Sequence, residues 1–323
     1  MTHLSTTSQV THLSTTSSLP FTHRVAGSEE QRNSSGFPDD DLLQGPNAAI
    51  LYLILILFLT TFLTTCALGL VGNGTVLWYL CFIIKKNPIT TYVLNLAAAD
   101  SAVLICLFCS YLFPFLKEEN DSSLVVLICF FLAYSSSQYL LTAISIEKCL
   151  SVIFPIWYRC HRLECLSAII CALLWIMPCL FLGGILLFTD VNLKVSQSIC
   201  IINFILCTPL VIISTAVLFM RVFCSLHRRQ HGRFFTVLLI TLLVYLLFGT
   251  PLSVMFIYTS FGYLNPIYMS ISMMGACINS SVNPLIYFLI GRKKMHRSKE
   301  TLKLVLQRVF SDNVDCRESG QST

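Results

Sequence analysis

Seven apolar stretches follow one another along this chain, and each is long enough to cross a lipid bilayer as a helix. A helix needs about 20 apolar residues to cross a hydrocarbon core of about 30 Å. The stretches cover residues 50–82, 89–115, 124–148, 165–188, 199–223, 234–261 and 267–290. Charged residues make up 11% of the chain, against about a quarter in soluble domains. The sequence therefore predicts an all-α membrane protein, a seven-transmembrane helix bundle over residues 50–290.

The basic residues are distributed unevenly between the two sides of this bundle. If the N-terminus is outside, the outer segments hold four of the 21 Lys and Arg residues, namely Arg24, Arg32, Lys117 and Lys194. Short basic loops remain cytoplasmic, so we expect a multi-pass plasma-membrane protein with an extracellular N-terminus. The same rule places the C-terminus in the cytoplasm, and an odd number of spans agrees with termini on opposite sides. A hairpin within residues 50–82 would make the number even, but no charge or Pro-Gly turn interrupts that stretch.

The segments that flank the bundle differ in composition. Residues 1–49 are polar, carry a Thr/Ser-rich repeat and are expected to form a disordered extracellular tail. Asn33 and Asn120 begin sequons in outer segments and are predicted glycosylation sites. Residues 291–323 are predicted to be cytoplasmic, with a short amphipathic eighth helix whose apolar positions are Leu302, Val305, Leu306, Val309 and Phe310. We expect this helix to lie on the membrane surface, and a soluble partner-binding helix is the alternative.

Motifs of enzyme chemistry are missing from the chain. It contains no HExxH, GxSxG or Walker sequence, so we do not expect an enzyme. Cys160, His161 and Cys165 have a spacing that fits no recognised zinc site, and no metal centre is predicted. Most of the 15 cysteines fall inside spans or at their inner ends, where they serve as small apolar packing residues.

Polar residues recur at the middle of several spans. They are Asn73, Asp100, Ser137, Asn279, Ser280 and Asn283. A carboxylate at bilayer depth costs roughly 2.5–3.5 kcal/mol on insertion scales, so Asp100 is expected to face the bundle interior. One carboxylate with hydroxyl and amide oxygens would accept a sodium ion with waters. A purely structural hydrogen-bond network explains the same residues equally well.

Two prolines and one charged pair interrupt the apolar sequence of the spans. Pro251 and Pro284 each remove a backbone hydrogen bond, so helices six and seven are expected to be kinked and able to pivot. The third stretch ends in Glu147-Lys148-Cys149, which predicts that these residues lie at the edge of the membrane.

These features together resemble the rhodopsin-like G protein-coupled receptors. The matching residues, in chain order, are Gly72-Asn73, Leu96-Ala97-Ala98-Ala99-Asp100, Glu147-Lys148-Cys149, Trp175, Pro209, Pro251 and Asn283-Pro284-Leu285-Ile286-Tyr287. Within that family the chain is similar to the Mas-related receptors, which usually have a small residue at the position of Gly249 where most relatives carry Trp. The stretches that carry this similarity are 139–147, 155–162 and 302–308.

The resemblance implies a switch that an extracellular agonist drives and a heterotrimeric G protein detects. It implies a sodium pocket formed by Asp100, Ser137, Asn279 and Ser280. An activation switch would consist of Asn73, Pro251, Asn283, Pro284 and Tyr287, and Glu147 and Lys148 would form the G protein interface. Lys148 departs from the family motif, which has Arg there, so a point ammonium replaces a planar five-donor fork.

The nature of the ligand is only partly constrained. Nine acidic residues stand against four basic ones in the outer segments, which would enrich cations near the mouth of the bundle, although a merely solvated surface is equally consistent. The resemblance implies a peptide or small cationic agonist. Residues that could line an apolar, aromatic pocket are Phe130, Tyr134, Phe256, Tyr258, Met269 and Met273.

A small seven-helix transporter or channel, with Asp100 on the ion path, is the alternative function. Such transporters often show internal repeats and ionisable residues in more than one span. Asp100 is the only carboxylate well inside a predicted span, and the spans show no internal repeat, so the receptor is favoured.

Overall fold

A computed structural model describes residues 46–84, 87–116, 120–154, 156, 166–186, 193–226, 233–263, 265–291, 306 and 309. The chain divides into two compact units, residues 1–52 and residues 53–323. Of the first unit only the start of a helix, from Pro46, is described. All contacts below lie within the second unit. The predicted extracellular tail up to residue 45, with Asn33, lies outside the described residues, as does the side chain of Asn120.

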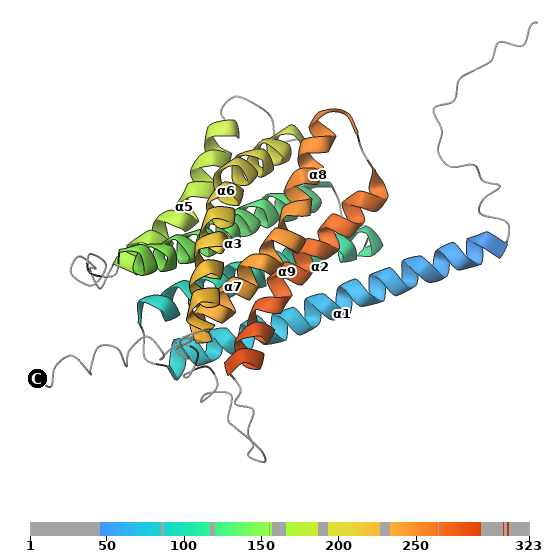
Figure 1. The fold of residues 1–323 in the computed structure, drawn as a ribbon. Coiled ribbons are helices and arrows are strands. Elements are labelled where there is room, and N and C mark those ends of the chain that lie inside the picture. Colours follow the sequence, from blue (N-terminus) through green and yellow to red (C-terminus); the bar gives the residue numbers. More distant parts are fainter. Residues whose placement is uncertain are drawn as a thin grey trace, which may run out of the picture. The chain divides into compact units, whose positions relative to one another are not determined.

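The described residues are almost all helical (Figure 1). The helices are α1 Pro46–Phe82, α2 Pro88–Leu116, α3 Asn120–Ile153, α5 Leu166–Leu186, α6 Leu193–Leu226, α7 Arg233–Val244, η2 Tyr245–Gly249, α8 Thr250–Ser260 and α9 Pro266–Gly291. Because α7, η2 and α8 follow without a break, they form one span. Over the described ranges this gives seven membrane-length helices, which confirms the predicted seven-helix bundle.

Six of these spans are long and apolar enough to cross a membrane by length and composition alone. They are α1, α2, α3, α5, α6 and the composite of α7, η2 and α8. The remaining helix, α9, has 26 residues, which is sufficient length. Asn279, Ser280 and Asn283 interrupt its apolar sequence. A helix with this composition is stable in lipid when its polar residues face other helices.

The third span is longer than the sequence predicted. We expected it to end at Glu147-Lys148-Cys149, but α3 continues to Ile153. Lys148 is 5% exposed and Cys149 is also buried, so these residues lie inside the bundle and not at a helix end. The helix ends shortly before Pro155, which disfavours helical geometry in the residue that precedes it. The boundary therefore follows proline and not the charged pair.

Two apolar clusters fill the bundle. One contains Leu104, Phe130, Phe131, Phe256 and Ala276 among others, and we call its side of the bundle the Phe130 end. The other contains Leu96, Leu141, Phe234, Leu238 and Tyr287 among others, and we call its side the Lys148 end. Helix α3 contacts α2, α5, α6 and α7 and thus connects most of the other spans.

The predicted amphipathic helix is described at two positions. Leu306 and Val309 are helical and buried against the apolar cluster of the Lys148 end. Their spacing of three residues matches the predicted apolar stripe. The other residues of that stripe lie outside the described part of the chain.

The sixth span contains a π-helical turn at the position where a kink was predicted. In η2 the Thr250 N–H donates to Tyr245 O, five residues back, and not to Leu246 O. The hydroxyl of Thr250 donates to Leu246 O instead, at 2.7 Å. Pro251 follows directly and has no N–H to continue the regular pattern. Turns of this kind are frequent at functional sites.

Candidate functional site

A buried carboxylate joins three helices at the centre of the bundle. Asp100 on α2 is fully buried. The Ser137 hydroxyl on α3 donates to its Oδ1 at 2.7 Å, and Asn283 Nδ2 on α9 donates to its Oδ2 at 2.7 Å. Ser280 is a further hydrogen-bonding neighbour of the carboxylate. Both carboxylate oxygens thus have donors, which offsets part of the cost of placing this group in lipid.

One acceptor beside this carboxylate is left over. The Oδ1 atom of Asn283 is buried and has no hydrogen-bond partner within the part of the chain that is described. An unpaired acceptor in a protein interior is able to bind a water or an ion. With a carboxylate and the hydroxyls of Ser137 and Ser280, it forms the oxygen set that a hard monovalent cation prefers. The arrangement fits a sodium ion with waters.

Asn279, the fourth residue of the predicted sodium pocket, lies beside the sixth span. Its side chain is buried, but it lies toward the sixth span. The amide carbon would be 3.5 Å from a Cβ placed on Gly249. The structure therefore gathers Asp100, Ser137 and Ser280 of the four residues of the predicted sodium pocket. It adds Asn283, one of the mid-span polar residues, which the family resemblance placed in the activation switch.

The first span is tied to the seventh beside the same centre. Asn73 Nδ2 donates to Gly69 O at 3.0 Å and across the helix boundary to Ser280 O at 2.9 Å. Beside Asn73, a Cβ placed on Gly72 would be 3.1 Å from Pro284 Cβ, and Pro284 lies one turn after Ser280 on α9. Asn73 and Pro284, two predicted switch residues, therefore belong to one contact surface between α1 and α9.

Aromatic side chains pack tightly at the Phe130 end. Phe130 and Tyr134 stack with ring centroids 5.6 Å apart, and Phe131 meets Phe256 edge-on at 5.2 Å. The Tyr134 hydroxyl donates to Gly249 O at 2.6 Å, which connects this cluster to the π-helical turn. Met269 and Met273 pack against the same cluster. Tyr258 is 55% exposed and lies outside it, so the structure groups five of the six predicted pocket residues.

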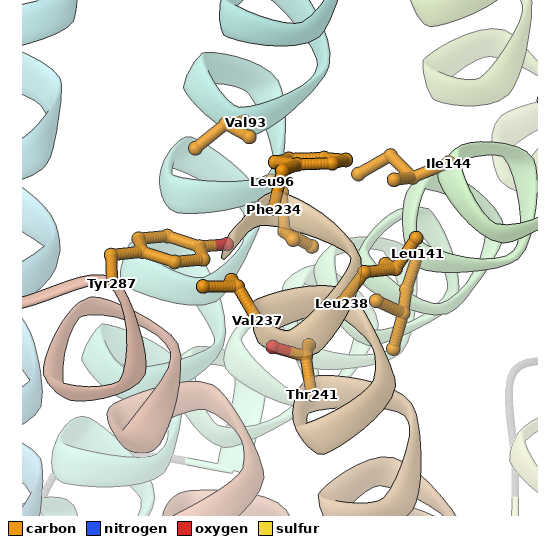
Figure 2. A pocket seen from close by; sticks show the side chains of 9 residues that line it. All are labelled: Val93, Leu96, Leu141, Ile144, Phe234, Val237, Leu238, Thr241 and Tyr287. Carbon is orange, nitrogen blue, oxygen red and sulfur yellow. The ribbon is translucent and has the colours of Figure 1, made fainter. Parts of the chain in front are cut away.

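A small cavity of about 10 Å³ lies between α2, α3, α7 and α9 toward the Lys148 end (Figure 2). A cavity of that volume has room for about one water molecule. Tyr287 and Phe234 both line it, with Val93, Leu96, Leu141, Ile144, Val237, Leu238 and Thr241. The cavity is almost entirely apolar, and Tyr287 brings a predicted switch residue to its wall.

Lys148 on α3 contacts Phe234 on α7, one of the residues that line this cavity. Its Nζ lies 5.0 Å from the centroid of the Phe234 ring, within the range of a cation–π contact. Lys148 and Phe234 are 5% and 3% exposed, so water does not screen the contact strongly. Glu147, the other predicted interface residue, is partly buried. Phe234 was not among the predicted site residues.

A second polar network links α3 to α6, and the sequence interpretation missed it. Tyr139 Oη donates to Asn203 Oδ1 at 2.6 Å, and Asn203 Nδ2 donates to Ser135 Oγ. Asn203 is fully buried. An amide within a predicted apolar stretch was the available signal, because a polar group at that depth needs a partner.

Comparison with known proteins agrees with this geometry. Residues 72–228 match the family model described as 7 transmembrane receptor (rhodopsin family). The chain is 37% identical to the Proto-oncogene Mas of Rattus norvegicus over 270 residues, which cover 77% of this chain and 82% of the relative. It is 36% identical to the Homo sapiens Mas over 269 residues, with the same two coverages.

The chain is also similar to a receptor named as Mas-related. The Mas-related G-protein coupled receptor member B4 of Mus musculus is 36% identical over 283 residues, which cover 82% of this chain and 86% of the relative. Nothing in these similarities favours the transporter or channel that was the alternative, and a receptor of this class is not an enzyme. The chain therefore belongs to the rhodopsin-like G protein-coupled receptors and, within them, to the Mas-related receptors, multi-pass proteins of the plasma membrane.

Proposed function

We propose that this G protein-coupled receptor binds an extracellular peptide or small cationic agonist at its Phe130 end and transmits the event through the Asp100 centre to the Lys148 end. The observation that carries the proposal is that buried hydrogen bonds join the helices beside the aromatic cluster and at the centre of the bundle. Tyr134 connects the aromatic cluster to the sixth span, and Asp100 connects α2, α3 and α9. An agonist that prefers one packing of these helices shifts the population of the bundle toward it.

Charge supports a cationic agonist. With the N-terminus extracellular, the outer segments hold nine acidic and four basic residues. A field of this sign concentrates cations near the bundle and accelerates their encounter with it. Methionine and aromatic side chains at the Phe130 end would receive the apolar part of such a ligand.

The same orientation would place Asn33 and Asn120 outside the cell, where both would be glycosylated. Treatment with a glycosidase would then reduce the mass of the receptor, and Asn33→Gln and Asn120→Gln should each remove part of this shift.

The agonist proposal is tested by exposing cells that express the full chain to matched basic, neutral and acidic peptides. G protein activation and transmembrane current are recorded together. We expect a G protein response to basic peptides that falls as salt rises, because salt screens the outer field. A current without a G protein response, or an equal response to acidic peptides, would contradict the proposal.

We also propose an allosteric sodium ion at the Asp100 centre. Asp100, Ser137, Ser280 and Asn283 would hold it, and its charge would favour the packing that draws α2, α3 and α9 together. Raising sodium is therefore expected to lower agonist affinity, and Asp100→Asn is expected to remove this dependence. Radioligand binding in sodium and in an equal concentration of a bulky organic cation measures the difference. Sodium dependence that persists in Asp100→Asn would disprove the site.

The Lys148–Phe234 contact leads to a prediction about agonist-independent signalling. Phe234→Leu removes the ring but keeps an apolar side chain, so α3 and α7 lose one attraction. A buried cation–π contact of about 0.5–2 kcal/mol corresponds to a roughly 2–30-fold change in the open population. We expect basal nucleotide exchange to rise by a factor in that range.

Two variants control this measurement. Phe234→Tyr keeps an aromatic face and should stay near the wild-type basal level. Phe235→Leu makes the same chemical change at the next, partly buried position and should also have little effect. Equal basal exchange in Phe234→Leu and Phe235→Leu would remove the contact from the switching equilibrium.

A further inference from the structure

Two cysteines meet inside the bundle, and neither takes part in the mechanism described above. Cys66 on α1 and Cys277 on α9 are both fully buried and both free. Their Sγ atoms are 3.3 Å apart and share an S–H···S hydrogen bond. Two sulfur atoms at this separation need only small side-chain rotations to reach the bonding distance of about 2.05 Å.

The backbones of α1 and α9 hold this pair together. A Cβ on Gly69 would lie closer than 3.0 Å to the Ser281 Oγ and to Leu104 Cδ1, so the two helices approach as closely as a glycine allows. Ser281 Oγ donates to Thr65 O at 3.2 Å across the same boundary. The short distance between the sulfur atoms is therefore a property of the helix packing and not of two loosely placed side chains.

The pair lies near the middle of the membrane along the helix axes, but close to the side of the bundle that faces lipid. Cys66 is 17 residues from Ala49 and 16 from Phe82, the two ends of the α1 span. Only 17% of the apolar window of α1 is buried, against 67% for α3, and Leu68 is 74% exposed. One helix thus separates the thiols from the surrounding lipid. A small oxidant dissolved in the acyl chains therefore has a shorter path to the two thiols than a water-soluble thiol reductant has.

We propose that Cys66 and Cys277 form an oxidisable dithiol, which a lipid-soluble hydroperoxide converts into a disulfide that tethers α1 to α9. In the first step one sulfur attacks the hydroperoxide, the O–O bond breaks, and a sulfenic acid and an alcohol form. In the second step the other thiol displaces the sulfenic oxygen, which leaves as water. The two thiols lose two electrons and two protons in total, and the hydroperoxide is reduced to alcohol and water.

The tether would act on the switch helix. Cys277 lies two helical turns before Pro284, and Asn283 and Tyr287 follow on the same helix. A covalent bond to α1 would restrain any movement of α9 relative to the first span. Oxidation is therefore expected to reduce the response to agonist, a consequence that rests on the proposed signalling function.

The chemical step is tested on the full-length receptor in lipid nanodiscs treated with cumene hydroperoxide. After quenching, the protein is unfolded in light N-ethylmaleimide, reduced, and labelled with the heavy reagent. We expect heavy label on Cys66 and Cys277 and a cross-linked peptide containing both before reduction. Cys171 and Cys207, also buried and free, should carry light label. Light label on both Cys66 and Cys277 in the wild type would overturn the proposal.

Two variants separate this bond from general oxidation. Cys66→Ser preserves side-chain size and should give no cross-linked peptide. Gly69→Ala keeps both thiols but forces α1 away from α9, and its cross-link yield should fall severalfold. A yield in Gly69→Ala equal to that of the wild type would show that the bond does not depend on this packing, which contradicts the proposal.

The restraint is measured as agonist-stimulated nucleotide exchange after the same treatment. Oxidised wild type is expected to lose about fivefold or more relative to treated Cys66→Ser, at the lower end of typical coupling between sites. A complete cross-link with an unchanged response would overturn the restraint. If untreated receptors fail to respond to any agonist, the proposed function fails, while the labelling pattern still decides the dithiol.

Discussion

Replacing Asn283 by leucine should abolish agonist-driven G protein activation and lower the thermal stability of the receptor. Leucine is close in size to asparagine but offers no donor to Asp100 Oδ2, which now accepts from Asn283 Nδ2 at 2.7 Å. A buried acceptor left without its donor costs about 1–3 kcal/mol, and more when it is charged. The change also removes one of the two hydrogen-bonding side chains that attach α9 to Asp100 on α2. Thermal unfolding of the purified receptor and nucleotide exchange on the G protein measure the two effects.

A surface change and a swap of the two groups sharpen this test. Thr64→Leu also removes a polar side chain, but Thr64 is exposed and donates to Thr60 O and Thr61 O of its own helix, its two partners among the described residues. The stability of this variant should therefore change little. The double variant Asp100→Asn with Asn283→Asp places the carboxylate on α9 and the amide on α2. It should recover part of the lost stability. No recovery in the double variant would argue against a direct contact between these residues.

The sequence predicted the spans and most of the polar centre because both follow from the cost of polar groups in lipid. Seven apolar stretches of sufficient length have few alternatives to helices that cross the membrane. Asp100, Ser137 and Ser280 were expected to meet because each needs a partner and each lies at a similar depth. The approximate helix ends followed from the same hydropathy, except in α3, which ends five residues later, before a proline, and in α6, which begins six residues earlier.

Other features depend on how the helices are rotated, and hydropathy does not report rotation in a helix that is apolar on all sides. Phe130 was predicted as a pocket residue, but the adjacent Phe131 makes the contact with Phe256. Asn279 carries the same polar signal as Ser280, yet it lies toward Gly249. The pairing of Lys148 with Phe234 joins residues far apart in sequence, and no local pattern marks it.

The sequence also did not determine which local geometry interrupts the helix of the sixth span. Pro251 predicts that one hydrogen bond is lost, but a kink, a bulge and a π-helical turn all satisfy that condition. The structure resolves the choice through Thr250, whose N–H and hydroxyl serve two different carbonyls. The turn places Phe248 O against α9, which leads to the second large effect that we expect.

Gly275→Ala is expected to destabilise the receptor strongly, although alanine is the smallest possible addition. A Cβ at this position would lie 2.6 Å from Phe248 O and 3.5 Å from Phe248 C. Because the nearest atom belongs to the backbone of η2, no side-chain rotation relieves the clash, and α9 must move away from the sixth span. Overpacking of this kind costs about 1–3 kcal/mol. The melting temperature of the purified receptor should fall by several degrees, with a parallel loss of agonist response.

Gly184→Ala on α5 is the matched control, because a Cβ there would meet no atom within 4 Å among the residues that the structure describes. Alanine in a helix is favoured over glycine by about 0.5–1 kcal/mol, so this variant should be neutral or slightly more stable than the wild type. The same intrinsic gain applies at Gly275, and the difference between the two variants therefore isolates the clash with η2. Equal melting temperatures for the two variants would mean that α9 does not approach the π-helical turn as closely as described, and the coupling of α9 to the sixth span would need another route.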